Sequence, residues 1–278
     1  LAALKNLTGI TLHKNKISDI GPLASLTDLI ILALHGNQVA DISPLGSLTH
    51  LTALTLGKNE ISDVGPLGSL TQLTTLILHQ NHVADISPLA SLVNLTVLTL
   101  LKNQLSNINP VGFLTNLTML LLNGNRISNI GALSSLENLT MLSLHRNQIS
   151  DISPLDRLEN LTILLLDDNQ ISNVYPLAFL TNLTHLSLEK NRLYDVTPFC
   201  ALTKLTRLAL SKNDISDIGP LSSLRGLVKL RLANNQLSDF TPLSPLTNLR
   251  KVLLYGNKGV DTAEKQTFAL SLFLRKAF

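Results

Sequence analysis

Asparagine recurs along this chain at a fixed interval of 22 residues, and this period limits the fold more than any other feature. The series runs without a slip through Asn15, Asn37, Asn59, Asn81, Asn103, Asn125, Asn147, Asn169, Asn191, Asn213, Asn235 and Asn257. A fixed period of this length is the mark of a solenoid, in which each copy buries its apolar face against the next copy. The chain is therefore expected to form a stack of equivalent turns.

The residues around each asparagine follow one frame, shown here by the second copy. It reads LxxLxxLxLxxNxIxDIxPL, with apolar positions at Leu26, Leu29, Leu32, Leu34, Val39, Ile42 and Leu45. This is the leucine-rich-repeat signature. Leucines two residues apart lie on the same side of a strand, so Leu32 and Leu34 predict a short strand with outward side chains between them. Pro44 fixes φ, and we expect an extended or 3-10 return path in place of a long helix.

The repeats predict a solenoid of the α/β horseshoe class, with a curved parallel sheet of about twelve short strands over residues 1–260. Each buried asparagine amide is expected to bond the backbone of adjacent turns. Residues 261–278 are predicted to form a C-terminal capping helix of the same domain, because Asp261 and Glu264 resemble a capping box. Three of its side chains would cover the last repeat: Phe268, Leu272 and Phe273. The N-terminal cap is missing, so we expect the natural protein to begin earlier.

Composition narrows the classes of function. Hydrophobic residues make up 45% of the chain and aromatic residues 4%, so the core must be almost wholly aliphatic. No apolar run is long enough for a membrane span, and no signal peptide is recognisable. The single cysteine, Cys200, cannot form an intrachain disulfide. A formal charge of +3 is too small to favour nucleic acid, and we expect a monomer without a cofactor.

The repeat phrase resembles that of the internalin family of bacterial surface proteins. It reads Leu114-Thr-Asn-Leu-Thr through Asn125-Arg-Ile-Ser-Asn-Ile, and recurs from Leu180 to Asn191. The resemblance implies a non-enzymatic protein whose concave face binds another protein, in adhesion or host recognition at the bacterial surface or after secretion. Two features depart from internalins, because no helical N-terminal cap is present and a helix stands where an immunoglobulin-like domain follows their repeats.

Two alternative interpretations stay open. An intracellular scaffold of the kind that regulates protein phosphatase 1 also has 22-residue repeats, but it lacks the regular Pro-Leu pair, and it would place the chain in the cytoplasm. An engineered or consensus-like array without a natural ligand would explain the high regularity. Uneven charge at the outward positions disfavours this last interpretation, because a consensus array would be uniform.

Binding residues are expected where the frame leaves the residue type free, chiefly six, four, two and one positions before each asparagine. In the middle of the array these positions are aliphatic: Val97, Leu101, Met119, Leu121, Met141, Ile163 and Leu165. Towards the C-terminus they become charged, with a tyrosine at the end: Asp167, Glu189, Arg207, Lys229, Arg231, Lys251 and Tyr255. An apolar surface followed by a basic one predicts a protein partner, with an acidic patch as one form of that partner.

Three arrangements could suggest chemistry, and none is favoured. Ser143, His145 and Asp167 resemble a hydrolytic triad, but residues two apart on a strand are roughly 7 Å apart and a smooth sheet offers no oxyanion hole. Asp167 and Glu189 are adjoining carboxylates that nearby basic residues would neutralise. His13 and His35 could supply two zinc ligands, with His79 and His82 further along the chain, but no third ligand is evident beside the first two.

Two further features lie off the concave face. Tyr175, Phe179, Tyr194 and Cys200 cluster in the eighth and ninth repeats and could form a lateral contact patch, with local packing as the simpler interpretation. Six Asn-Leu-Thr triplets match the glycosylation acceptor pattern but are expected to be part of the repeat: Asn6, Asn94, Asn116, Asn138, Asn160 and Asn182.

Overall fold

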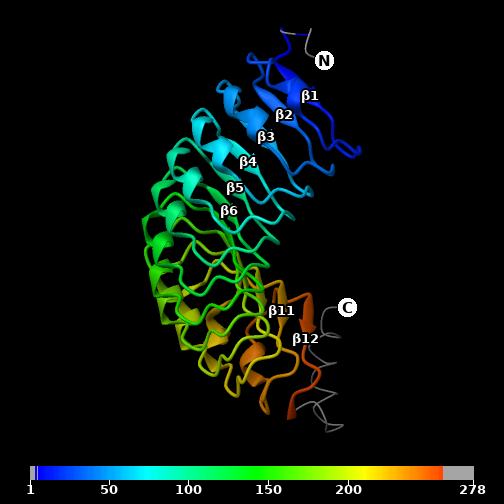
Figure 1. Cartoon of the computed structure of the whole chain (residues 1–278). Helices are drawn as coiled ribbons and strands as arrows, with labels where there is room; N and C mark the ends of the chain where they lie inside the picture. Colours follow the sequence, from blue (N-terminus) through cyan, green and yellow to red (C-terminus); the bar gives the residue numbers. More distant parts are fainter. Residues whose placement is uncertain (1–3, 5, 259–278) are drawn as a thin grey trace. The chain divides into compact units, whose positions relative to one another are not determined.

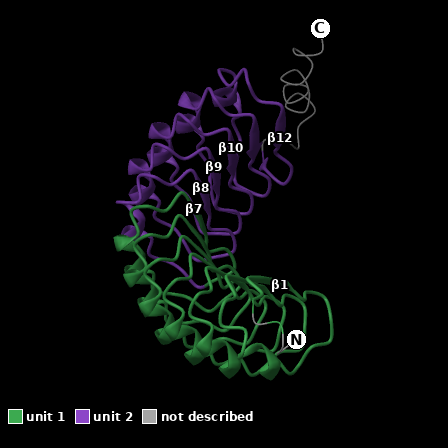
Figure 2. Cartoon of the chain, turned by 90° about the horizontal axis from the view of Figure 1, so that it is seen from above, with its two compact units in different colours: residues 1–147 green, residues 148–278 purple. Residues whose placement is uncertain are grey.

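The computed structural model describes residue 4 and residues 6–258, and the chain divides into two compact units, Leu1–Asn147 and Gln148–Phe278. Unit 1 contains seven strands: β1 (Gly9–Thr11), β2 (Ile31–Ala33), β3 (Ala53–Thr55), β4 (Thr75–Ile77), β5 (Val97–Thr99), β6 (Met119–Leu121) and β7 (Met141–Ser143). Unit 2 contains five: β8 (Ile163–Leu165), β9 (His185–Ser187), β10 (Arg207–Ala209), β11 (Lys229–Arg231) and β12 (Lys251–Leu253). Figure 1 labels β1 to β6, β11 and β12, and Figure 2 labels β7 to β10.

Each strand pairs in parallel with its neighbours in the sequence, in a constant register of one repeat. Within unit 1, Val97 of β5 lies beside Met119 of β6, and Met119 lies beside Met141 of β7. Within unit 2, Arg207 of β10 lies beside Lys229 of β11. This register brings residues of the same type of position together in columns, so the sequence of one column can be read as a surface.

Short 3-10 helices form the return path of each repeat. In unit 1 they are η1 (Gly21–Leu23), η2 (Ser43–Ser47), η3 (Gly65–Ser69), η4 (Ser87–Ser91), η5 (Asn109–Phe113) and η6 (Gly131–Ser135). In unit 2 they are η7 (Ser153–Leu155), η8 (Tyr175–Phe179), η9 (Thr197–Ala201), η10 (Gly219–Ser223) and η11 (Thr241–Leu243). In each unit the strands line the inner, concave side and the 3-10 helices the outer side (Figure 2).

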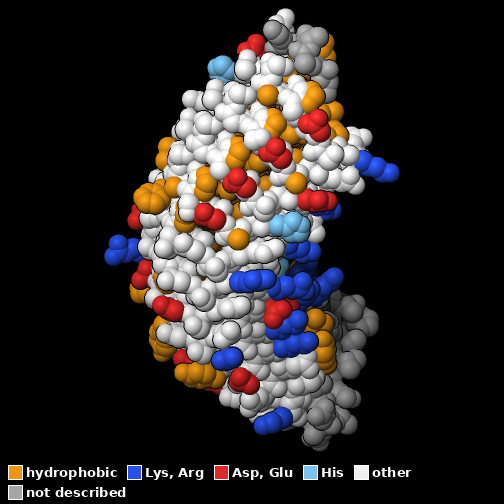
Figure 3. Space-filling view, viewed as in Figure 1, with side chains coloured by type: hydrophobic (Ala, Val, Ile, Leu, Met, Phe, Trp, Pro, Cys, Tyr) orange, Lys and Arg blue, Asp and Glu red, His pale blue; other side chains and the backbone are white. Residues whose placement is uncertain are grey.

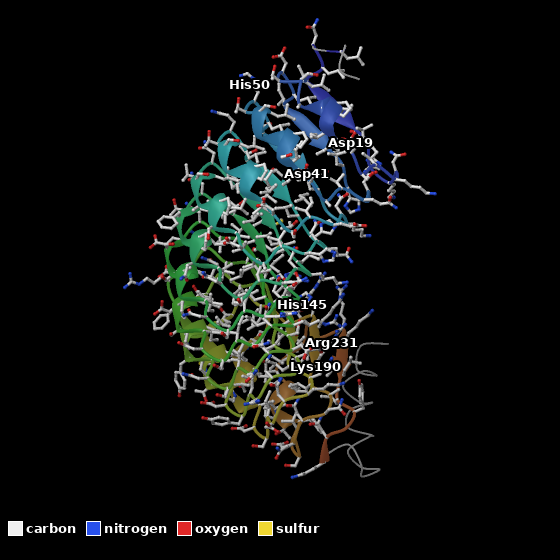
Figure 4. All side chains as sticks on the ribbon, in the orientation of Figure 1. Asp19, Asp41, His50, His145, Lys190 and Arg231 are labelled. Carbon is white, nitrogen blue, oxygen red and sulfur yellow. The ribbon has the colours of Figure 1, made fainter. Side chains whose placement is uncertain are left out.

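A side-chain oxygen starts each of these turns. Asp41 Oδ1 accepts a hydrogen bond from the Ser43 N–H at 2.8 Å, and Asp19 Oδ1 accepts one from the Gly21 N–H at 2.7 Å. Figure 4 labels both aspartates. Proline at the start of most of these helices supplies the φ that the turn needs. The Asp-Ile-x-Pro-Leu part of the frame therefore encodes a tight 3-10 return.

The core is a stack of leucines tied together by the repeated asparagines. Leu98, Leu120 and Leu142 are fully buried on successive strands. Asn125 Nδ2 donates to the Leu122 carbonyl at 2.8 Å and to the Leu100 carbonyl at 3.1 Å, while its Oδ1 accepts from the Leu105 N–H at 3.0 Å. One side chain thus closes its own turn and joins it to the preceding repeat.

The leucine-rich-repeat fold predicted from the sequence is confirmed, including the short parallel strands and the 3-10 return path. The predicted C-terminal helix, with its capping residues, lies outside the described residues. Among those residues, no helix has the length and apolar character to cross a membrane.

Candidate functional site

The concave face of unit 1 is aliphatic around β5 to β7. Val97, Met119 and Met141 occupy one column, and Leu101 and Leu121 lie in the columns beside it. All five side chains are only partly exposed, because neighbouring strands about 4.8 Å apart let them cover one another. This surface is therefore apolar and smooth. Ile163 and Leu165 take the corresponding positions on β8 of unit 2, and they are partly exposed as well.

The concave face of unit 2 carries a ladder of basic side chains. His185, Arg207, Lys229 and Lys251 are paired residues on four successive strands, β9 to β12. The last three are exposed. Like charges in directly adjacent positions destabilise a sheet, so strand stability does not favour this column. Figure 3 shows Lys and Arg side chains gathered where β11 and β12 lie in Figure 1.

Acidic residues beside the ladder are held by local interactions. Arg231 Nη1 lies 3.8 Å from Glu189 Oε2, and Lys190 Nζ lies 3.9 Å from Asp168 Oδ2. Figure 4 labels Lys190 and Arg231. Surface pairs of this kind contribute about 0–1 kcal/mol. Tyr255 and Leu253 are exposed at β12 and border the same face. The arrangement offers a basic surface with an aromatic edge.

The ladder also acts on its histidine. Burial, followed by the charges of Arg207 and Lys229, lowers the pKa of His185 below its ordinary value. The His185 Nδ1 atom lies 2.9 Å from the Thr184 hydroxyl. His185 is therefore neutral at neutral pH, and its protonation in acid adds one more charge to the basic column.

Two of the arrangements considered for catalysis have local structural roles. The expected separation of Ser143 and His145 is wrong, because the Ser143 hydroxyl lies 3.0 Å from His145 Nδ1. Side chains on the same face of a strand can lean together even though their Cα atoms are far apart. Ser143 is nevertheless only 2% exposed, and its hydroxyl also donates to Asn123 Oδ1 at 3.3 Å. A buried hydroxyl of this kind cannot meet a substrate in the folded state.

Asp167 does not form an acid/base pair with Glu189. Its Oδ1 atom accepts hydrogen bonds from the Ser187 hydroxyl and from the Glu189 N–H, the latter at 2.7 Å. The Glu189 carboxylate instead faces Arg231. Within the described part of the chain, no group of three or more His, Cys, Asp or Glu side chains could hold a metal ion.

Aromatic side chains project from the outer side of both units. Phe113 and Phe179 stand where most other repeats have serine, and they are 66% and 62% exposed. The serine at this position donates to the preceding repeat, as Ser135 Oγ does to the Gly112 carbonyl at 2.8 Å. Tyr175 and Tyr194 of unit 2 are also exposed, and Cys200 is a free, exposed thiol. The aromatic outliers named from the sequence are therefore surface residues.

The Asn-Leu-Thr triplets have a structural role in the repeat. Asn94 Nδ2 donates to the Thr71 carbonyl at 2.9 Å, and Asn116 Nδ2 donates to the Val93 carbonyl at 3.0 Å. The threonine hydroxyls form a second ladder, since Thr96 Oγ1 donates to the Thr74 carbonyl at 3.1 Å. These bonds explain the triplet without glycosylation.

Comparisons with known proteins agree with this architecture. The family model for leucine-rich repeats (2 copies) matches residues 5–47, 71–112, 115–157 and 203–245. The crystal structure of an internalin, InlF from Listeria monocytogenes, is 36% identical and has a TM-score of 0.90. The alignment covers 91% of this chain and 75% of InlF. This chain belongs to the internalin-like family of leucine-rich-repeat proteins.

Other internalin-like structures show the same fold. The functional domain of InlJ from Listeria monocytogenes is 27% identical, with a TM-score of 0.83 over 91% of this chain and 54% of that one. A leucine-rich-repeat protein of Leptospira interrogans is 27% identical, with a TM-score of 0.91 over 99% of this chain and 72% of that one. A search of curated protein sequences gave no match. The internalin-like chain thus shares its architecture with bacterial repeat proteins, which supports a role as a protein-interaction module.

Proposed function

We propose that this internalin-like protein binds a partner protein that presents an acidic surface to the concave face of unit 2. The observation that carries the proposal is the column of Arg207, Lys229 and Lys251. Neighbouring side chains in a parallel sheet are about 4.8 Å apart, so their charges repel one another at short range. The negative charges of an acidic partner would attract these side chains and offset their mutual repulsion, and such a partner would associate faster at low salt.

The remaining predicted contact residues fit the same role. Glu189 is partly buried and pairs with the exposed Arg231, whose side chain can turn to a partner, and Tyr255 supplies an exposed ring of the kind enriched at interfaces. On unit 1 the partly exposed column of Val97, Met119 and Met141 is a candidate apolar contact. We treat the basic surface of unit 2 and the apolar column of unit 1 as separate contact surfaces, and the proposal does not require one partner to contact both.

Membership of the internalin-like family suggests where in the cell this binding takes place. The structural relatives in Listeria are internalins, so we propose that the protein acts in adhesion or recognition at the bacterial cell surface or after secretion. Binding alone accounts for the proposed role, and no catalytic step is assigned to any residue.

A pair of matched charge reversals tests the proposal. The variant Arg207→Glu/Lys229→Glu alters the ladder, whereas Arg157→Glu/Arg225→Glu makes the same change in net charge at exposed positions beside η7 and η10 of unit 2. Partners are captured from host and bacterial lysates with the parent chain and identified, and their dissociation constants are measured. We expect the ladder variant to weaken binding at least tenfold, about 1.4 kcal/mol, and the control variant to bind like the parent. Equal binding by all three chains would contradict the proposal.

A further inference from the structure

Three histidines and one glycine form a column on the concave face of unit 1. His13, His35, Gly57 and His79 stand two positions before successive asparagines. His35 and His79 belong to repeats that are not adjacent, yet their ring centres are only 5.1 Å apart with an angle of 46° between the ring planes. Two imidazoles therefore meet across an intervening strand.

Gly57 is the reason that these rings can meet. A Cβ atom added at Gly57 would lie 2.5 Å from His79 Cε1 and 2.7 Å from His79 Nδ1. The imidazole of His79 therefore occupies the space that any other residue at position 57 would fill. Gly57 itself does not have a positive φ, so the turn does not require glycine there. The approach of His79 is a packing reason for glycine at this position.

The orientation of His79 leaves the buried hydroxyl of Thr99 without a hydrogen bond to any residue that the structure describes. In the seventh and ninth repeats, Ser143 and Ser187 donate to the side chain 20 residues earlier, which is Asn123 or Asp167. The equivalent partner of Thr99 is His79. Among the described residues, Thr99 Oγ1 is buried without a hydrogen-bond partner, and Thr99 is 7% exposed. Leaving a buried hydroxyl unpaired is unfavourable, yet the His79 ring lies towards His35.

We propose that His35 and His79 form an open two-imidazole site for a late first-row divalent metal ion, with Cu²⁺ bound most tightly. With metal–nitrogen bonds of about 2.0–2.1 Å, two imidazoles that share one ion have ring centres about 4.5–5.5 Å apart. The observed 5.1 Å lies in this range. Imidazole suits zinc, copper and nickel, and Cu²⁺ has the highest affinity of the divalent ions in this series. The remaining coordination positions belong to water, as expected for a site with two protein ligands.

Positively charged side chains lie near both imidazoles. Burial, followed by the charges of Lys58, Lys14 and His13, lowers the pKa of His35. Burial, His35 and Lys58 lower the pKa of His79. Lys58 is exposed, so salt screens its repulsion of the ion, and affinity should rise with ionic strength.

Copper titration of the untagged full chain tests this site. Cu²⁺ binding is followed by calorimetry and by electron paramagnetic resonance at neutral pH in a buffer that does not coordinate metal. The parent is expected to bind one ion more tightly than any other, with hyperfine structure from two nitrogens. His35→Ala and His79→Ala should each weaken this ion at least tenfold. Gly57→Ala should do the same with both histidines present, because its methyl group displaces the His79 ring.

His82→Ala is the matched control, since it removes an exposed imidazole three residues from His79 but in a different column. It should bind Cu²⁺ like the parent. Circular dichroism and the urea midpoint show that each variant is folded. A parent chain without a tight site would overturn the proposal, and so would parent-like affinity in Gly57→Ala or in the double variant His35→Ala/His79→Ala.

Discussion

Replacing Asn125 with alanine tests the role of the repeated asparagine most clearly. Its side chain makes three hydrogen bonds, to the carbonyls of Leu100 and Leu122 and from the N–H of Leu105, and it is 9% exposed. Each bond contributes about 0.5–1.5 kcal/mol, and a buried group left unpaired costs about 1–3 kcal/mol. Water can reach part of the space that the smaller side chain leaves. We therefore expect the free energy of unfolding to fall by about 2–4 kcal/mol.

Asn116→Ala supplies the control for this change, because it removes the same side chain from the same repeat. Asn116 is exposed, and its Nδ2 donates one hydrogen bond of 3.0 Å to the Val93 carbonyl, so its loss should cost less than about 1 kcal/mol. Urea unfolding followed by circular dichroism measures both variants, and amide exchange reports the Leu105 N–H directly. If Asn125→Ala costs no more than Asn116→Ala, or if the Leu105 amide keeps its protection, the repeated asparagine does not join adjacent repeats.

Three further outcomes are expected. Leu142→Ala should cost about 2–5 kcal/mol in urea unfolding because Leu142 is fully buried, whereas Leu121→Ala on the outward side of β6 should cost clearly less; equal costs would contradict the assigned faces. In the folded chain the pKa of His185 is lowered from 6.5, so the unfolded chain binds more protons and the stability falls as the pH drops below about 6.5. His185→Asn should make this fall less steep between about pH 7 and pH 5. An unchanged dependence of stability on pH would contradict this expectation. Phe113→Ser should change the urea midpoint little, within about 0.5 kcal/mol, since the ring is 66% exposed; a large loss would show that the ring is part of the core.

The fold could be predicted because every repeat has the same residue types at the positions that determine its strand, its turn and its 3-10 helix. Leu32 and Leu34 place a strand, Asn37 closes the turn, and Asp41 with Pro44 starts the 3-10 return. Each requirement is local or depends on a copy one repeat away, so periodicity supplies the tertiary contacts. The parallel register follows from the same 22-residue spacing, and the charged column on β10 to β12 could be named in advance.

The details of the surface could not be predicted, because strand alternation gives the side to which a side chain points but not its rotamer. Strand spacing predicts that Ser143 and His145 lie apart, yet the Ser143 hydroxyl lies 3.0 Å from His145 Nδ1, because the two side chains point towards each other. The sequence suggested His13 and His35 as neighbouring imidazoles, whereas the ring contact is between His35 and His79. The sequence signal for this contact is Gly57, but its role becomes clear only from the structure, where the His79 ring occupies the space of a side chain at position 57.

Backbone conformation at the strand ends was also not anticipated. The residue before each of the twelve repeated asparagines has a positive φ, for example 54° at Lys102 and 56° at Lys190. Glycine takes this conformation at Gly36 and Gly124, and a side chain such as lysine takes it only at some cost. The positive φ at this position, where most repeats have a polar residue other than glycine, cannot be derived from the hydrophobic pattern, because that pattern carries no information about φ.

We propose that the outward basic column of unit 2 serves binding at the expense of strand stability. Lys229→Thr tests it most directly, with the free energy of unfolding and the affinity for the captured partner measured on the same sample. Threonine favours strands and removes like-charge contacts with Arg207 and Lys251, so stability should stay equal or rise by up to about 1 kcal/mol while affinity falls. A variant that loses stability and keeps the affinity of the parent would show that the basic column serves the strands and not binding.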